Sequence, residues 1–321
     1  MTPEPARHNA SDEDSNVYAT LENLLRCRLI AKDLKLSKQR KILSLQTGMH
    51  SSTFRGRGID FAEVRAYQAG DDIRTIDWRV TARTGRPHTK LYTEERERPA
   101  LVIVDQSQSM FFGSHVAFKS VVAARAAALL AWSALARGDR IGAIVFADTQ
   151  HREIRPRRSH HTVLQLTETL LEYNHALNLK NTPKPSYTLA DSLQQARRIL
   201  KPGSELFIIS DFADFDESSR SHLYQLSKHN DVVSVLIYDR LEEQLPPPGA
   251  YTISDGAQRV QVDLHDKQAR ATYAQIFGGK IKLLQSRLDQ LKIPLVKLRT
   301  DQDLLTSLMS GLGIREPLNK L

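Results

Sequence analysis

Three short oxygen-bearing side chains follow directly after the apolar run A-L-V-I-V. They are Asp105, Ser107 and Ser109, in the segment V-D-Q-S-Q-S-M. Serine and aspartate are common in turns, so these residues alone do not distinguish a solvated turn from one side of a metal site. A second carboxylate, Asp211, ends the later apolar run F-I-I-S, and Thr188 lies in a loop directly before a predicted helix.

Carboxylates and hydroxyls from three loops are the ligands that Mg²⁺ or Mn²⁺ prefers, because hard cations bind oxygen. Two carboxylates and three hydroxyls, each binding through one oxygen, do not complete an octahedral shell. We therefore expect a Mg²⁺ (or Mn²⁺) site that leaves one position for an acidic oxygen from outside the chain. The alternative is helix capping and turn formation without a metal.

The elements that must position these residues form a regular alternation from residue 99 onward. Strands are expected at 100–104, 140–147, 149–156, 205–210, 231–238 and 293–298, and helices at 117–137, 161–177, 189–200, 217–229, 265–291 and 302–312. Apolar strands alternating with helices predict an α/β fold with a mostly parallel sheet covered on both faces. Ligand sites in such folds lie beyond the carboxyl ends of the strands, where both aspartates would lie.

The chain is expected to have three parts. Residues 1–16 are polar and acidic and predict a disordered tail. Residues 17–98 combine a basic helical segment with an arginine-rich region, and residues 99–321 form the α/β domain with a hairpin insertion at about 241–264. In the helical segment, apolar residues recur at the spacing of an amphipathic helix, at Leu21, Leu24, Leu25, Leu29, Ile30 and Leu34.

Composition limits the remaining classes. The formal net charge is +8, but aromatic interleaving and a nucleic-acid motif are lacking, so solvated basic helix faces are favoured and no nucleic-acid partner is expected. A single cysteine, Cys27, fits a reducing compartment. The N-terminus lacks a signal-like pattern and the longest apolar stretch, 126–136, is too short for a bilayer. We expect a cytoplasmic protein without a transmembrane segment, with peripheral membrane contact left open.

The order of D-Q-S-Q-S, then Thr188, then Asp211 resembles the von Willebrand factor A fold and its metal-ion-dependent adhesion site. The resemblance implies that Ser107 and Ser109 bind the metal directly. It also implies that Thr188 binds it directly or through water according to state, and that both aspartates act directly or through water. The family often has glycines before the threonine, where this chain has Ser186 and Tyr187.

A second resemblance covers the run G-I-D-F-A-E-V-R-A-Y-Q-A-G-D-D-I-R-T-I-D-W-R-V-T-A-R-T-G-R-P-H-T-K. It is similar to the signature of bacterial proteins catalogued as domain of unknown function 58, in which it precedes a von Willebrand A-like domain. The matched residues are Gly58, Phe61, Arg65, Tyr67, Gly70, Asp71, Asp72, Arg74, Asp77, Trp78, Arg79 and Arg83. Acidic and arginine side chains at this density predict salt-bridge networks, and Trp78 and Tyr67 are expected to be packing anchors.

The resemblance implies a non-enzymatic, metal-dependent protein-interaction module. Such proteins are commonly encoded beside AAA+ ATPases of the MoxR type, which implies an adaptor or co-chaperone in protein-complex assembly or maturation. The partner would supply a Glu or Asp. One alternative is a metal-assisted phosphohydrolase using Asp105 and Asp211, although the sequence contains no identifiable general base, Walker motif or nucleophile elbow. The other is a basic nucleic-acid or membrane-surface binder.

Overall fold

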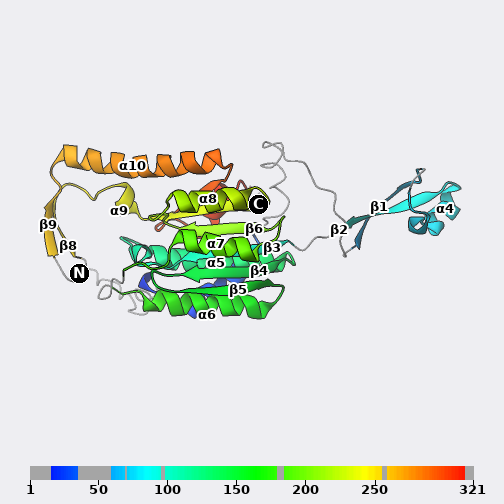
Figure 1. Ribbon diagram of the computed structural model, residues 1–321, viewed down its shortest axis with the longest axis horizontal. Coiled ribbons are helices and arrows are strands. Elements are labelled where there is room, and N and C mark those ends of the chain that lie inside the picture. Colours follow the sequence, from blue (N-terminus) through cyan, green and yellow to red (C-terminus); the bar gives the residue numbers. More distant parts are fainter. Residues whose placement is uncertain are drawn as a thin grey trace, which may run out of the picture. The chain divides into compact units, whose positions relative to one another are not determined.

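The protein divides into two compact units, each described here by itself. The computed structural model describes residues 16–34, 59–68, 71–94, 98–178, 184–254 and 259–314. The large unit joins residues 1–47 to 98–321, and the small unit spans 48–97 (Figure 1). The predicted tail over residues 1–16 lies outside the described residues except for Asn16. The carbonyl oxygen of Asn16 accepts a hydrogen bond from Phe118 N at 2.9 Å.

A six-stranded sheet forms the centre of the large unit. Its spatial order is β10-β7-β6-β3-β4-β5. The strands are β3 (Pro99–Asp105), β4 (Arg140–Phe146), β5 (His151–Arg157), β6 (Glu205–Ser210), β7 (Asp231–Tyr238) and β10 (Leu295–Arg299). Only β5 runs antiparallel to its neighbour in this sheet. The predicted α/β fold with a mostly parallel sheet is therefore confirmed.

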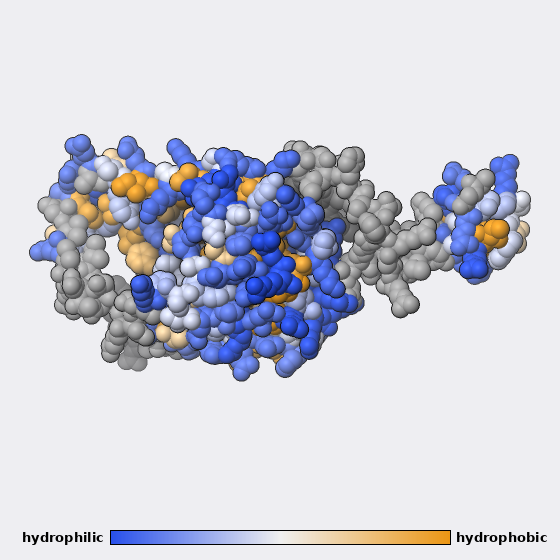
Figure 2. Space-filling view, in the orientation of Figure 1, coloured by the Kyte–Doolittle hydropathy of each residue, from blue (hydrophilic) through white to orange (hydrophobic). Residues whose placement is uncertain are grey.

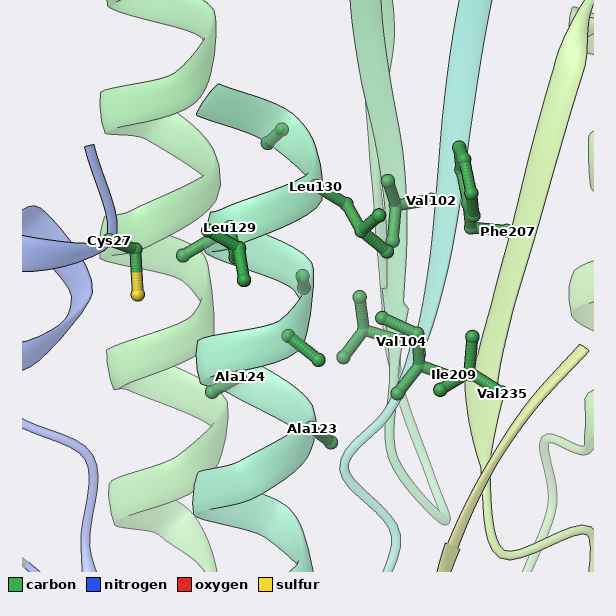
Figure 3. Packing of buried hydrophobic residues seen from close by; sticks show 14 of the residues in the cluster. Cys27, Val102, Val104, Ala123, Ala124, Leu129, Leu130, Phe207, Ile209 and Val235 are labelled. Atoms are coloured by element: carbon green, nitrogen blue, oxygen red, sulfur yellow. The ribbon is translucent and has the colours of Figure 1, made fainter. Parts of the chain in front are cut away.

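Helices cover both faces of this sheet. They are α2 (Leu21–Ile30), α5 (Lys119–Ala136), α6 (His160–Ala176), α7 (Leu189–Ile199), α8 (Glu217–Ser227), α10 (Lys267–Gln290) and α11 (Leu304–Gly311). The first three and α11 contribute to one buried apolar cluster, and α7, α8 and α10 to the other. Figure 3 shows Leu130 of α5 pointing toward the strands and Leu129 pointing toward α2. The sheet thus separates two apolar cores.

Strand β3 is fully buried, and its position determines where a site can form. Its apolar residues from Ala100 to Val104 have no exposed surface. Leu101 and Ile103 belong to one core and Val102 and Val104 to the other, as expected for a strand covered on both faces. The chain runs from β3 to β4 and β5 on one side and later returns to β6 on the other. The strand order therefore reverses between β3 and β6.

Helix α2 packs against α5 through only some of the leucines that predicted it. Leu24 and Cys27 are buried, whereas Leu29 is 70% exposed. Arg28 lies over the Trp132 ring of α5, with 5.3 Å from its guanidinium carbon to the ring centroid. The predicted helix is present, and of the six apolar residues named for it Leu24 and Leu34 are buried, whereas the other four are exposed. Because of this packing, α2 belongs to the large unit and not with the arginine-rich region.

Helix α5 is an Ala-rich core helix. Among the described residues it is the one helix that is long and apolar enough to cross a membrane by composition, and 83% of it is buried inside the protein. A buried core helix can meet the same criteria of length and hydropathy as a membrane-spanning helix. On the outer surface, apolar residues also occur along α10 (Figure 2), where Ile276 and Leu283 are more than half exposed.

A short hairpin and a one-turn helix lie between β7 and α10. The strands are β8 (Ala250–Ser254) and β9 (Arg259–Asp263), which pair antiparallel, and the helix is α9 (Arg240–Glu243). They fall within the segment in which a hairpin insertion was predicted. The residues that connect the two strands, 255–258, lie outside the described residues.

The small unit contains an antiparallel pair and two short helices. The strands are β1 (Ile59–Ala66) and β2 (His88–Glu94), and the helices are η1 (Ile73–Thr75) and α4 (Trp78–Thr84). Asp72 caps η1, Asp77 caps α4, and Asp71 pairs with Arg65 at 2.8 Å. The predicted salt bridge between acidic and arginine side chains is therefore present at Asp71, whereas Asp72 and Asp77 cap helices. Trp78 is 68% exposed in its unit, so the packing role predicted for it is wrong.

Two glycines test the packing directly. At Gly142 of β4 a Cβ atom would lie 2.6 Å from the Ile154 carbonyl oxygen and 2.7 Å from Pro156 N. Gly142→Ala is therefore expected to destabilise the protein by about 1–3 kcal/mol. Gly278 of α10 has nothing within 4 Å of such a Cβ, so Gly278→Ala should stabilise by about 0.5–1 kcal/mol. Urea unfolding measures both, and a neutral Gly142→Ala would contradict the close approach of β4 and β5.

Candidate functional site

Asp105 lies at the carboxyl end of β3, buried with 2% of its surface exposed. One of its carboxylate oxygens accepts a hydrogen bond from Ser107 N at 2.9 Å. The other accepts one from the Ser210 hydroxyl at 2.5 Å. Ser210 is the last residue of β6, so the Asp105 carboxylate lies at the junction of β3 and β6. This is where the strand order reverses.

Ser107 and Ser109 lie in the turn that follows β3. Their hydroxyl oxygens are 3.1 Å apart, and the buried Met110 anchors the turn in the core. Gln106 is fully buried, and its side chain donates to the Ser120 carbonyl and accepts from Asn174. These contacts hold the turn against α5 and α6, which places both hydroxyls at the edge of the sheet.

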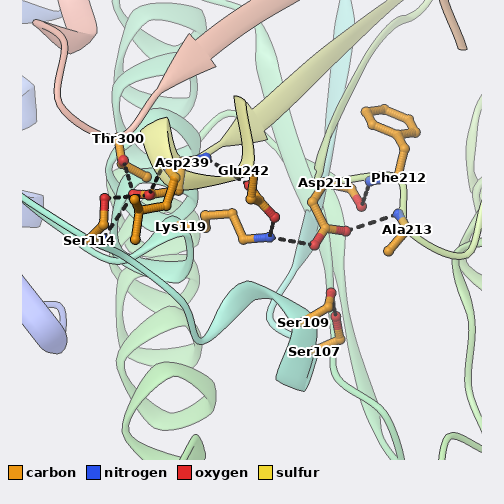
Figure 4. A network of polar contacts seen from close by, with 12 residues as sticks. Ser107, Ser109, Ser114, Lys119, Asp211, Phe212, Ala213, Asp239, Glu242 and Thr300 are labelled. Atoms are coloured by element: carbon orange, nitrogen blue, oxygen red, sulfur yellow. Dashed lines mark hydrogen bonds and ion pairs between the residues drawn. The ribbon is translucent and has the colours of Figure 1, made fainter. Parts of the chain in front are cut away.

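Asp211 directly follows β6 at the same edge. Its Oδ1 accepts from Ala213 N at 3.0 Å, and its Oδ2 pairs with Lys119 Nζ at 2.9 Å. Phe212, the next residue, has a φ of 54°, a left-handed conformation that is costly for a side chain of this size. Figure 4 shows Ser107 and Ser109 at the same end of the sheet as Asp211. The structure thus brings together four of the five predicted ligands.

Thr188 is engaged differently from the other four residues. It caps α7 in a capping box, in which the Thr188 hydroxyl oxygen accepts from Asp191 N and Thr188 N donates to Asp191 Oδ2. The Thr188 hydroxyl also donates to Asp191 Oδ2 at 2.8 Å. The next residue, Leu189, donates its N–H to Asp214 Oδ2 at 3.0 Å. The loop that carries Thr188 therefore contacts the loop that follows β6. The Thr188 hydroxyl, however, forms its hydrogen bonds within the first turn of α7. In this structure Thr188 therefore acts as a helix cap, which was the alternative to its predicted role as a metal ligand.

Lys119 and Glu242 are members of the site that the sequence analysis did not identify. Lys119 is the first residue of α5, and its ammonium lies 2.9 Å from Asp211 and 2.8 Å from Glu242 (Figure 4). It is buried, with a side chain only 3% exposed. Burial lowers the pKa of Lys119, but the attraction of Asp211 and Glu242 outweighs this, and the pKa is raised overall. Lys119 is therefore charged.

The electrostatics of Asp105 favour a nearby cation. Burial, and then repulsion from Asp211, raise the pKa of Asp105 to about 7. Two desolvated carboxylates at one sheet edge are costly unless positive charge is present. Among the described residues no group of three or more His, Cys, Asp or Glu could hold a metal. Hydroxyl oxygens would therefore have to complete the ligand set, and Ser107 and Ser109 supply them.

A second buried carboxylate connects the site to the neighbouring strands. Asp239 follows β7, and its oxygens accept from the Ser114 hydroxyl at 2.5 Å and the Thr300 hydroxyl at 2.6 Å. Glu242 accepts from Asp239 N at 2.7 Å and, through its other oxygen, from Lys119. Figure 4 shows the resulting chain of contacts from Thr300 to Asp211. The carboxyl ends of β6, β7 and β10 are therefore linked through polar side chains.

Asp239 is expected to make the protein sensitive to acid. Burial would raise its pKa, but hydrogen bonds from Ser114, Thr300 and backbone N–H groups outweigh burial and lower the pKa. A lowered pKa contributes stability that is present above the unfolded pKa and is lost as the pH falls through the folded value. We expect Asp239→Asn to cost about 1–3 kcal/mol at neutral pH.

The cost of Asp239→Asn should shrink in acid, below about pH 4, where the wild type loses the same contribution. Urea unfolding of both proteins across the acid range measures the difference. A cost that does not change with pH would contradict the role of the Asp239 charge.

The fold and the site define an α/β protein with a cluster of carboxylates and hydroxyls at the reversal of strand order. A family model described as "Protein of unknown function DUF58" matches residues 63–278, which is more than half of the chain. The chain belongs to this family. The resemblance inferred from the arginine-rich signature is thereby confirmed.

Relatives of the chain occur in mycobacteria. The uncharacterized protein Mb1516 of Mycobacterium bovis and the uncharacterized protein Rv1480 of Mycobacterium tuberculosis are each 27% identical over 288 residues, covering 88% of this chain and 88% of the relative. The match therefore extends over most of both proteins.

Two solved structures are similar at low scores. One is the conserved hypothetical protein BatB from Bacteroides thetaiotaomicron, with 10% identity, coverage of 67% of this chain and 97% of that chain, and a TM-score of 0.37. The other is an aerotolerance-related membrane protein from Bacteroides fragilis with multiple mutations to serines. It has 15% identity, coverage of 70% and 100%, and a TM-score of 0.37. Neither assigns a role to a residue of this chain.

Proposed function

We propose that the protein is a non-enzymatic, divalent-metal-dependent protein-interaction module with a von Willebrand A-like fold. The observation that supports this most is the position of Asp105 and Asp211 at the carboxyl ends of two adjacent strands, beside the paired hydroxyls of Ser107 and Ser109. Ligands from separate loops at a strand-order reversal are what a binding site in this kind of fold requires.

The donor set fits a hard cation. Asp105, Ser107, Ser109 and Asp211 offer only oxygen, which suits Mg²⁺ or Mn²⁺. Thr188 would join them only after its hydroxyl leaves Asp191. A bound divalent ion would supply an electrophilic position for an acidic oxygen from another molecule. This set of ligands remains incomplete, and the missing oxygen is the basis for proposing that a partner carboxylate binds here.

The surrounding charged groups support binding and not catalysis. A hydrolase would need a general base next to the metal. Three charged neighbours among the described residues are engaged within the chain. Lys119 is protonated and paired, Glu242 accepts hydrogen bonds from Lys119 and Asp239 N, and Asp214 accepts one from Leu189 N. These contacts favour the interaction module over the phosphohydrolase.

We propose a MoxR-type AAA+ ATPase, or its client, as the partner. The family resemblance supports this choice, and an adaptor or co-chaperone role in complex assembly or maturation follows from it. In this account a glutamate or aspartate of the partner provides the acidic oxygen at the metal. Contact would be made at the sheet edge that carries the half-buried Ser107 and the exposed Ser109.

Capture of the ATPase by the immobilised protein tests this proposal. Binding in Mg²⁺ is expected to fall about tenfold or more in EDTA, since one metal-bridged contact accounts for at least 1.4 kcal/mol. Ser107→Ala should cause a similar loss. Ser218→Ala, at an exposed serine on α8, serves as the matched control and should bind as the wild type does.

Two results would contradict the proposal in different ways. Equal capture with Mg²⁺ and EDTA would exclude a metal-bridged contact. Absence of capture under all conditions would exclude the ATPase as the partner, whatever the state of the metal site.

A further inference from the structure

Lys119 occupies a position that helix stability does not explain. It is the first residue of α5, and the positive end of the helix dipole disfavours a cation there. It is also buried, with its ammonium 5.9 Å from the centroid of the Phe112 ring, and a buried ammonium is costly unless it is paired. The contacts with Asp211 and Glu242 provide that pairing. The position of Lys119 is therefore understood through these two carboxylates.

The Lys119 ammonium and a metal ion would require the same carboxylate. Lys119 Nζ lies 2.9 Å from Asp211 Oδ2, and Ala213 N donates to Asp211 Oδ1. Both oxygens of Asp211 are thus engaged within the chain. A divalent ion that uses Asp211 must share the carboxylate with Lys119 or displace the ammonium toward Glu242, which lies 2.8 Å away on its other side.

We propose that Lys119 is the resident counter-ion of the metal site and competes with the divalent cation for Asp211. This inference rests on the proposed function. It makes Lys119 a positioning residue that weakens metal binding by the isolated protein. A carboxylate brought by the partner adds the negative charge that Lys119 offsets, so metal and partner bind more tightly together than either does alone. Glu242 receives the displaced ammonium and links metal binding to α9.

The inference predicts opposite effects for two neighbouring substitutions. Lys119→Met removes the competing cation and leaves Asp211 and Glu242 without a positively charged partner, although each keeps its hydrogen bond from a backbone N–H, so Mg²⁺ affinity should rise. Glu242→Gln removes the second partner of Lys119, leaves the ammonium to Asp211 alone, and should weaken Mg²⁺ binding. A purely structural role for Lys119 would instead make both variants bind less Mg²⁺.

The test is calorimetric titration of the full-length proteins with Mg²⁺ and with Mn²⁺, beside melting temperatures with and without the ion. Lys119→Met should lower the dissociation constant at least about tenfold, because one unit charge a few ångströms away acts strongly at a partly buried site. Lys201→Met, at an exposed lysine, is the charge-matched control and should change nothing. The double variant Lys119→Met/Glu242→Gln keeps the charge balance if the single variant does not fold, and it should also bind Mg²⁺ more tightly than wild type.

The outcomes separate this inference from the proposed function. Wild type that binds Mg²⁺, with variants lacking Lys119 that bind equally or more weakly, would overturn the counter-ion role and leave the metal site intact. Binding only by the variants lacking Lys119 would support competition and contradict metal-dependent function in the wild type. No binding by any protein would overturn both.

Discussion

Asp105→Asn is expected to abolish the Mg²⁺-induced rise in melting temperature while stabilising the metal-free protein at about pH 8. The first effect follows because the variant loses a ligand and a negative charge. The second follows because burial and Asp211 raise the pKa of Asp105 to about 7, so its ionised form opposes folding. A gain of a few degrees is expected, at roughly 2–4 °C per kcal/mol for a protein of this size.

The pH dependence distinguishes this effect from general stabilisation. A raised folded pKa means that the wild type loses stability as the pH rises from the unfolded pKa toward the folded value. The advantage of Asp105→Asn should therefore grow between about pH 4 and 7 and then remain constant. Asp239→Asn is the contrasting control, because the pKa of Asp239 is lowered and its replacement destabilises. A metal response that persists in Asp105→Asn would contradict the site.

Leu24→Ala is expected to have the second large effect, a loss of about 2–5 kcal/mol. Leu24 is fully buried where α2 packs on α5, so truncation leaves a cavity in the apolar cluster. Leu29→Ala on the same helix is the matched control. Leu29 is mostly exposed, and its truncation should stay within about 0.5 kcal/mol. Guanidinium unfolding compares them, and equal losses would contradict the observed face of α2.

Most of the large unit could be predicted from sequence because its strands are continuous apolar runs separated by regular helices. The run Ala100–Val104 is buried on both faces, and E-L-F-I-I-S matches β6 residue for residue. The position of Asp105 and Asp211 at one edge then follows from the parallel order of the strands. The two carboxylates, and the turn that carries Ser107 and Ser109, could therefore be predicted from the sequence alone.

The remaining parts of the site depend on tertiary contacts that have no local signature. Lys119 looks like an ordinary residue in the first turn of an Ala-rich helix, and Glu242 lies 123 positions away along the chain. Only the sheet order brings β6 and β7 beside the start of α5. The Thr188 hydroxyl could bind either a metal or Asp191. The spacing of Thr188 and Asp191 is typical of a capping box, and it could have predicted that Thr188 contacts Asp191.

The buried face of α2 was predicted only in part. Leucine spacing identified the helix and included the buried Leu24, but it also included the exposed Leu29 and left out the buried Cys27. Cysteine behaves as a small apolar residue when buried and was not counted. Trp78 shows the opposite error, because a large aromatic side chain was expected to be packed and is exposed on α4.

The most direct test of the metal site is an anomalous diffraction experiment on crystals of the protein grown with Mn²⁺. The account predicts a manganese peak at the carboxyl ends of β3 and β6, roughly 2.1 Å from the hydroxyl oxygens of Ser107 and Ser109, the distance usual for such hard cations. It also predicts that Lys119 moves from Asp211 toward Glu242. A well-ordered site without a manganese peak, with Lys119 still on Asp211, would contradict the account.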